Sequence, residues 1–134
     1  MNRPLPTPSS PSDHAATMRA VRQERYGSDP HAVLAVAEVP RPATPRHGVL
    51  VEVAAAGVDM GTWHCMTGTP LAMRLAGFGV RAPRALNPAR AFAGTVAAVG
   101  ADVTSVRPGD RVYGTAVGTF AEYVVAKDRQ VALA

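Results

Sequence analysis

The sequence is poor in cysteine and in aromatic residues, and it lacks long apolar runs. Cys65 is the only cysteine in 134 residues, so it can form neither an intrachain disulfide nor a cysteine-based zinc site. Aromatic residues make up 5% of the chain and no predicted helix carries a basic stripe, which argues against a nucleic-acid partner. No stretch is long and apolar enough to cross a membrane, and residues 1–17 lack the apolar segment of a secretory signal. These absences predict a cytoplasmic protein that binds neither nucleic acid nor membrane.

Acidic residues are missing from the middle of the chain. The net charge is +4, and no Asp or Glu lies between Asp59 and Asp102. That interval does contain four arginines, namely Arg74, Arg81, Arg84 and Arg90. The region should carry a positive potential that favours an anionic ligand, unless these arginines only form a solvated loop face.

Glycine and proline are abundant, with 12 of each, and they separate short apolar runs as the turns of a mainly β chain do. Strands are expected at residues 18–23, 33–39, 49–57, 92–99, 111–113, 119–126 and 130–133. Between them we expect a short helical turn or irregular chain at 58–68, a helix starting at Pro70, and a loop at 81–88. Residues 49–53 alternate in a way that predicts one buried face. The pattern indicates one domain at 18–134 after a disordered tail at 1–17. Its fold is a partly open β-barrel with one or two short helices, with an open sandwich as the alternative.

One apparent nucleotide-binding motif has the wrong surroundings. Residues 77–82 match the pattern G-x-G-x-x-A, and Asp102 follows about twenty residues later, where a ribose-binding acid would lie. A dinucleotide fingerprint needs a strand before it and a helix after it. Here a helical pattern precedes the glycines and Pro83 follows them. We therefore do not interpret this motif as a cofactor site.

A group of chemically versatile residues follows the strand at 49–57. Asp59, Trp63, His64 and Cys65 lie within seven positions of one another. Histidine can give or take a proton near neutral pH, and tryptophan can stack on a flat ring. This pattern indicates a cleft, although simple packing of Trp63 with hydrogen bonding by His64 is the alternative. The other histidines lack metal-ligand spacing, so no metal site is expected.

Three segments together resemble one enzyme superfamily. They are AAGVDMGTWHCMTG at residues 55–68, the run from FAGTVAAVG to VRPGDRVYG at 92–114, and GTFAEYV at 118–124. This combination resembles the medium-chain dehydrogenase/reductase superfamily, and residues 18–134 correspond to its N-terminal, GroES-like catalytic domain. The resemblance implies a GroES-like barrel. It also implies a Rossmann domain, absent from these residues, that would hold most of the NADP or NAD.

The zinc-dependent branch of that superfamily does not match. Its catalytic cysteine would fall at Asp59, and its Gly-His-Glu would fall at residues 89–91, which are Ala-Arg-Ala. The chain is instead similar to the zinc-independent, quinone-oxidoreductase-like branch, which implies no metal. That branch commonly has Pro-Gly-x-Asp where residues 88–91 read Pro-Ala-Arg-Ala. Ala89 replaces a glycine that can adopt positive φ, and Ala91 replaces a carboxylate, so both bear on activity.

The resemblance also implies a chemistry and assigns roles by position. The reaction would be hydride transfer from NADPH or NADH to a quinone, an enone or a carbonyl compound. The roles are catalysis for His64 and Asp59, substrate binding for Trp63, Met66 and Phe78, and cofactor binding for Asp59 and Thr62.

Three interpretations of the chain follow. The first is the N-terminal portion of a zinc-independent oxidoreductase, as a fragment, a truncated gene or a split product whose Rossmann domain is a partner chain, and it is inactive without that domain. The second is a stand-alone GroES-like binding module. The third, a GroES-like co-chaperone, is disfavoured because the sequence has no mobile apolar loop of the required kind.

Overall fold

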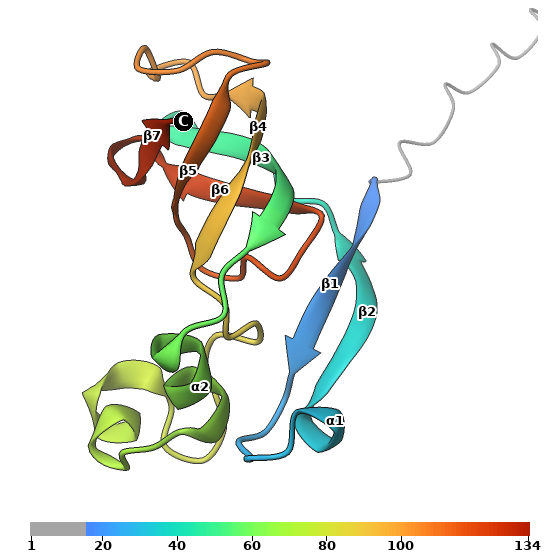
Figure 1. The fold of residues 1–134 in the computed structure, drawn as a ribbon, viewed down its shortest axis with the longest axis vertical. Coiled ribbons are helices and arrows are strands. Elements are labelled where there is room, and N and C mark those ends of the chain that lie inside the picture. Colours follow the sequence, from blue (N-terminus) through green and yellow to red (C-terminus); the bar gives the residue numbers. More distant parts are fainter. Residues whose placement is uncertain (1–15) are drawn as a thin grey trace, which may run out of the picture.

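The computed structural model describes residues 16–134, so most of the expected tail at 1–17 lies outside the described residues. Figure 1 shows three parts: a curled sheet, a lobe that contains helix α2 (Met60–Thr67), and a two-stranded ribbon that runs beside both. The ribbon pairs β1 (Thr17–Gln23) with β2 (Leu34–Pro40) in antiparallel register. A short helix α1 (Pro30–Val33) connects them.

The main sheet has five strands in the order β6-β3-β4-β5-β7, and neighbouring strands are antiparallel. The strands are β3 (Gly48–Ala56), β4 (Ala91–Val99), β5 (Arg111–Thr115), β6 (Tyr123–Lys127) and β7 (Val131–Leu133). The sheet curls into a half-barrel (Figure 1). The predicted fold class, a mainly β and partly open barrel with short helices, is therefore confirmed.

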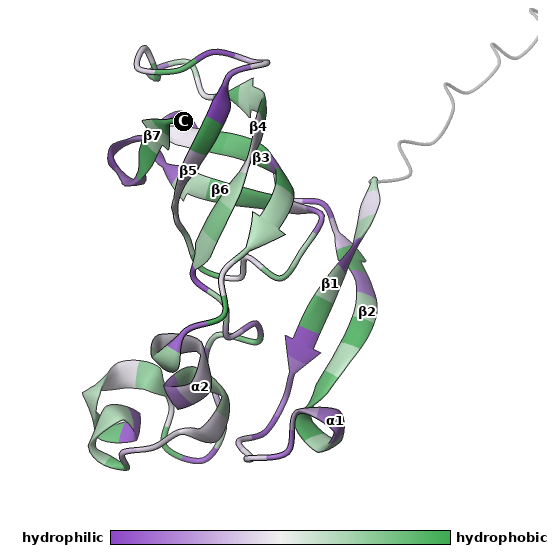
Figure 2. Ribbon diagram, in the orientation of Figure 1, coloured by the Kyte–Doolittle hydropathy of each residue, from purple (hydrophilic) through white to green (hydrophobic). Residues whose placement is uncertain are grey.

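The hydrophobic core lies inside the curl of this sheet. Its buried members come mostly from β3, β4, β5 and β6, and Figure 2 shows the hydrophobic residues along these strands. Val49 and Val51 of β3 are fully buried, as predicted. Leu50 is buried as well, at 6% exposure, so the expected single buried face of this strand is wrong at that position. A register shift between Leu50 and Val51 interrupts the alternation there.

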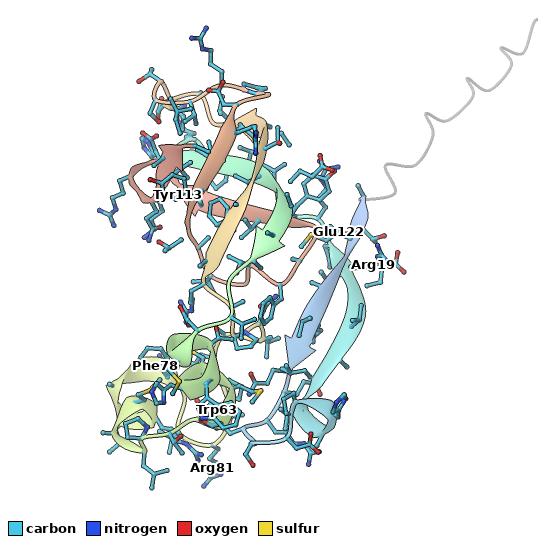
Figure 3. The ribbon with its side chains drawn as sticks, in the orientation of Figure 1. Arg19, Trp63, Phe78, Arg81, Tyr113 and Glu122 are labelled. Atoms are coloured by element: carbon cyan, nitrogen blue, oxygen red, sulfur yellow. The ribbon has the colours of Figure 1, made fainter. Side chains whose placement is uncertain are left out.

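The ribbon is joined to the main sheet by backbone contacts and one surface ion pair. Ala20 and Ala121 form a β-bridge between the two parts. The guanidinium of Arg19 lies 3.0 Å from the carboxylate of Glu122, and Figure 3 shows the two residues at this junction. Because both side chains are exposed, the ion pair adds little stability, and the backbone contacts fix the ribbon.

The lobe is the long connection between β3 and β4. Its ends are held together, because the N–H of Gly57 donates to the carbonyl of Ala91 over 3.0 Å. The short helical turn expected at 58–68 is a complete helix, α2, and the loop expected at 81–88 is confirmed. The segment after Pro70 ends in a π-helical turn, η1 (Arg74–Phe78). Leu75 in this turn is 81% exposed.

Most of the expected strands begin or end a residue or two away from their predicted bounds, and two of the differences have a clear physical reason. Val33 belongs to α1 because Asp29 caps that helix and Pro30 fits its first position, so the strand begins one residue later. The strand expected at 119–126 is replaced by a loop up to residue 122 and by β6 after it. The loop is bonded elsewhere, since the carbonyl of Ala89 accepts the N–H groups of Gly118 and Thr119.

A glycine at the end of β4 gives the first test of the fold. A Cβ on Gly100 would lie 2.0 Å from the carbonyl oxygen of Pro45 and 2.2 Å from that of Arg46. We expect Gly100→Ala to lower the free energy of unfolding by about 3 kcal/mol, at the upper end of single substitutions. Gly109→Ala is the control, because its Cβ meets nothing within 4 Å and only its φ of 93° is strained, at about 1 kcal/mol. Urea denaturation measures both, and equal losses would contradict the steric argument.

Candidate functional site

The start of helix α2 is fixed by a carboxylate. Asp59 is its N-cap, and Oδ1 accepts hydrogen bonds from the Thr62 N–H at 2.8 Å and the Thr62 hydroxyl at 3.2 Å. These two bonds stabilise the charged form and lower the pKa of Asp59 below its ordinary value. Asp59 is therefore ionised at neutral pH, where it accepts hydrogen bonds and does not donate a proton.

The end of α2 is held by a cation. Gly68 is the C-cap of the helix, and the Arg74 Nε donates to the Gly68 carbonyl over 2.9 Å. A positive charge is favourable at this end of a helix, where the last carbonyls point outward. The same guanidinium lies 4.4 Å from the ring centroid of Tyr26. Arg74 thus joins α2 to the turn that follows β1.

Tyr26 in turn holds the π-helical turn η1. Its hydroxyl lies 2.8 Å from the carbonyl oxygens of both Phe78 and Gly79 and can donate to either. The tyrosine therefore connects the turn after β1 with the C-terminal end of α2 and with η1, which lie about fifty residues away in the sequence. This arrangement sets the distance between α2 and η1.

A small pocket of about 80 Å³ lies where these segments meet, and we name it the α2 pocket. The residues that matter for its chemistry are His64, Cys65, Phe78, Arg84, Arg90 and Tyr26. His64 is partly exposed, and its Nδ1 is shielded from solvent with no hydrogen-bond partner in residues 16–134. Exchange of a proton with a ligand would therefore involve Nε2.

The structure brings two of the predicted site residues together in this pocket. His64 and Phe78 both line it, although they come from different helical segments. Trp63 precedes His64 on α2, does not line the pocket, and is 41% exposed. Figure 3 shows Trp63 and Phe78 in the same lobe.

The other predicted site residues lie apart from the pocket. Asp59 and Thr62 bond to each other at the start of α2, and Thr62 is 6% exposed. Met66 is 4% exposed, and its carbonyl accepts a 2.6 Å hydrogen bond from Nε2 of the fully buried Gln23. Substrate binding by Met66 and cofactor binding by Asp59 and Thr62 stay predictions.

Sequence reasoning did not assign a site role to Tyr26, Arg84 or Arg90. The only signal for the arginines was the lack of acidic residues between Asp59 and Asp102. Tyr26 gave no signal, because its partners are about fifty residues away along the chain. Within the part of the chain that the structure describes, neither Arg84 nor Arg90 forms an ion pair.

A larger concavity of about 670 Å³ lies beside β6, and we name it the β6 groove. Its wall is mostly apolar, with Val117 and Val125 among the lining residues and Lys127 and Arg129 beside them. None of the predicted site residues lines it. The histidine that lines this groove is His47, and its Nε2 lies 3.5 Å from the carboxylate of Asp102. The α2 pocket is therefore the better-equipped site for chemistry, despite its smaller volume.

The backbone conformation shows whether alanine can stand at position 89, where the related branch commonly has glycine. No non-glycine residue in the described part of the chain has positive φ, so Ala89 occupies its position without that strain. It is fully buried. The apparent fingerprint at 77–82 begins within η1 rather than after a strand, which agrees with its rejection as a nucleotide site.

Two further candidate features are absent from residues 16–134. No group of three or more His, Cys, Asp or Glu side chains in this range is arranged to hold a metal ion. None of the helices in the same range has the length and apolarity needed to cross a bilayer.

Comparison with known proteins identifies relatives over most of the chain. A quinone oxidoreductase of Lama guanicoe is 33% identical over 117 residues, covering 85% of this chain and 32% of that protein. The solved quinone oxidoreductase of Coxiella burnetii is 26% identical with a TM-score of 0.73, covering 88% of this chain and 37% of that one. The mycobacterial protein Rv1454c, solved with NADPH, is 25% identical with a TM-score of 0.68, and the match covers 87% of this chain and 32% of that one.

The chain thus spans about a third of the length of the relatives it matches. The alcohol dehydrogenase GroES-like domain family matches residues 45–134, which is more than half of the chain. The half-barrel and the lobe inserted between β3 and β4 lie largely within that range. The chain therefore belongs to the alcohol dehydrogenase GroES-like domain family of the medium-chain dehydrogenase/reductase superfamily.

Proposed function

We propose that this chain is the substrate-side portion of a zinc-independent, NAD(P)H-dependent oxidoreductase that reduces a quinone, an enone or a carbonyl compound. The observation that carries the proposal is the α2 pocket, where a partly exposed histidine lies beside aromatic side chains. The quinone oxidoreductases among its relatives support the same reaction class. Trp63 and Phe78, at 41% and 40% exposure, offer flat surfaces to a conjugated substrate.

His64 has the role of hydrogen-bond and proton donor in this proposal. Addition of hydride to a quinone, an enone or a carbonyl compound leaves negative charge on the substrate oxygen. A positioned N–H group stabilises that charge, and transfer of its proton completes the reduction. The Nε2 of His64 takes this role because Nδ1 is shielded. Asp59, which is ionised, positions α2 and does not supply the proton.

NADPH or NADH would supply the hydride when bound. The described residues fit only the nicotinamide end of that cofactor. Asp59 is exposed at the start of α2, and both hydrogen bonds from Thr62 go to its Oδ1. The other carboxylate oxygen of Asp59, Oδ2, is left for an amide donor. The strand pairs in residues 16–134 are all antiparallel, so this range supplies no parallel βαβ unit for the pyrophosphate. A Rossmann domain outside these residues would bind that part.

We propose zinc independence because of the side chains that stand at the positions of the zinc ligands. Asp59 stands where the zinc-dependent branch has its catalytic cysteine, and its Oδ1 is already bonded to Thr62. Arg90, a cation, occupies the middle of the segment that would carry the histidine and glutamate ligands. This set of side chains is a poor match to the ligands that zinc prefers.

A stand-alone binding module is the second candidate function, and the β6 groove favours it. The groove is apolar, and Val117 at its edge is 59% exposed. Exposed apolar surface of this kind commonly marks an interaction site. In this alternative the chain binds another protein through the groove and the α2 pocket takes no part in a redox reaction.

The first test asks whether the chain acts alone. The purified 134-residue chain with NADPH and 1,4-benzoquinone should oxidise NADPH no faster than the reaction without enzyme, because residues 16–134 supply no βαβ unit for the pyrophosphate. Absorbance at the NADPH band measures this. Turnover at an ordinary enzymatic rate would contradict the proposed division of the cofactor site.

The second test examines His64. Fusion of residues 16–134 to the remainder of the Coxiella burnetii quinone oxidoreductase should give a chain that reduces quinones. In that fusion, His64→Gln should lower kcat by about 100-fold, the usual loss when a general acid is removed. Cys65→Ser is the matched control and should stay within about threefold of the parent. Equal activity of the His64 variant and the parent would rule out the proton-donor role.

The third test concerns the cap of α2. Asp59→Ala should lower the melting temperature at pH 7, while Asp59→Asn, which can still cap the helix, should lower it less. The lowered pKa of Asp59 stabilises the fold above pH 4, and this contribution is lost as the pH falls through the folded value. The gap between the parent and Asp59→Asn should therefore shrink from pH 7 to pH 3. A constant gap across this range would show that the charge of Asp59 has no part in the cap.

A further inference from the structure

We propose that the α2 pocket binds a carboxylate group carried by the substrate, through Arg84 and Arg90. The substrate class is then a small enone or carbonyl compound that also bears a carboxylate. The reduction part of this inference rests on the proposed function, whereas binding of the carboxylate stands by itself. In the reaction, hydride and one proton add across the double bond while NAD(P)H becomes NAD(P)⁺, and the carboxylate is unchanged.

The charge of the pocket is one-sided. Arg84 comes from the loop that follows η1, and the partly buried Arg90 directly precedes β4, yet both line the same small pocket. No Asp or Glu is among the lining residues. Arg84 is exposed and Arg90 is partly buried, and both stay protonated at any ordinary pH, so they give the pocket a positive potential. A bound anion would be attracted to that potential.

The protein itself does not supply this anion within the described range. The ion pairs of residues 16–134 use the carboxylates of Glu24, Asp102 and Glu122, all outside the lobe. Asp59, at the start of the lobe, is bonded to Thr62. Arg74 differs from the two pocket arginines, because it already binds the end of α2. Arg84 and Arg90 therefore offer uncommitted positive charge at the pocket.

The chemistry of the lining residues favours a carboxylate on an apolar stem. A guanidinium presents parallel N–H groups that match the two oxygens of a carboxylate. The ring of Phe78 lines the same pocket and offers an apolar surface to the carbon stem. His64 lines the same pocket, so in this proposal its imidazole polarises a carbonyl oxygen on that stem.

The test is a binding titration of the full 134-residue chain followed by amide chemical shifts, with no cofactor present. The probe is 4-oxopentanoate, which carries a ketone and a carboxylate, and its uncharged methyl ester is the comparison. We expect the acid to shift the amides of His64, Cys65 and Phe78, and the ester to bind at least tenfold more weakly. Arg84→Gln and Arg90→Gln should each weaken the acid about tenfold. Arg81, labelled in Figure 3, does not line the pocket, so Arg81→Gln removes the same charge and should change the affinity for the acid less than twofold.

The outcomes separate this inference from its alternatives. Equal binding of acid and ester, or equal losses in the Arg81 and Arg84 variants, would overturn it. Inorganic phosphate that binds as tightly as 4-oxopentanoate, with the same dependence on Arg84, would assign the pocket to phosphate instead. If a glutamine variant fails to fold, Arg84→Lys and Arg90→Lys keep the charge and should show intermediate affinity. Carboxylate binding by a chain whose fusion reduces no substrate would uphold this site and overturn the proposed reaction.

Discussion

The pairing of β3 with β4 is the constraint on which the rest of the structure depends. The two strands are paired from Val49 opposite Val99 to Ala56 opposite Phe92, and β3 also pairs with β6 on its other side. The whole lobe is the connection between these two strands. Because its two ends leave the ladder side by side, the lobe begins and ends at a fixed point on a well-packed sheet. Everything proposed for the site depends on that anchoring.

Beyond its anchored ends, the lobe is held mainly by polar contacts. The core of buried apolar side chains belongs to the sheet and the loop after β4, and α2 contributes few fully buried residues. The contacts that place α2 are the Asp59 cap, the Arg74 bonds at the other end, and the buried amide of Gln23 on the carbonyl of Met66. A region with few buried apolar contacts opens more readily than a core. That property suits the substrate-binding role proposed for the lobe.

The two concavities have complementary chemistry. The α2 pocket is small and carries an imidazole and two guanidinium groups, whereas the β6 groove is large and mostly apolar. The first suits recognition of a small polar or anionic group, and the second suits contact with another protein surface. The chain spans about a third of the length of its relatives, so the proposed division between substrate contacts here and nucleotide contacts elsewhere is physically reasonable. The antiparallel architecture of residues 16–134 is consistent with that division.

The sequence alone determined the strand order along the chain, the loop at 81–88, the family, and the location of His64 just after a buried strand. These features depend on local patterns, namely alternation, turn residues and short motifs, which are legible without a structure. The sequence could not give the burial of Leu50, the split of the 119–126 strand, or the joining of Tyr26 with Arg74 and η1, because each results from contacts between distant segments. The site shows the same division. His64 and Phe78 could be named from the sequence, but only the tertiary structure placed Arg84 and Arg90 around the same pocket, since their charge acquires a function only from the side chains that surround it.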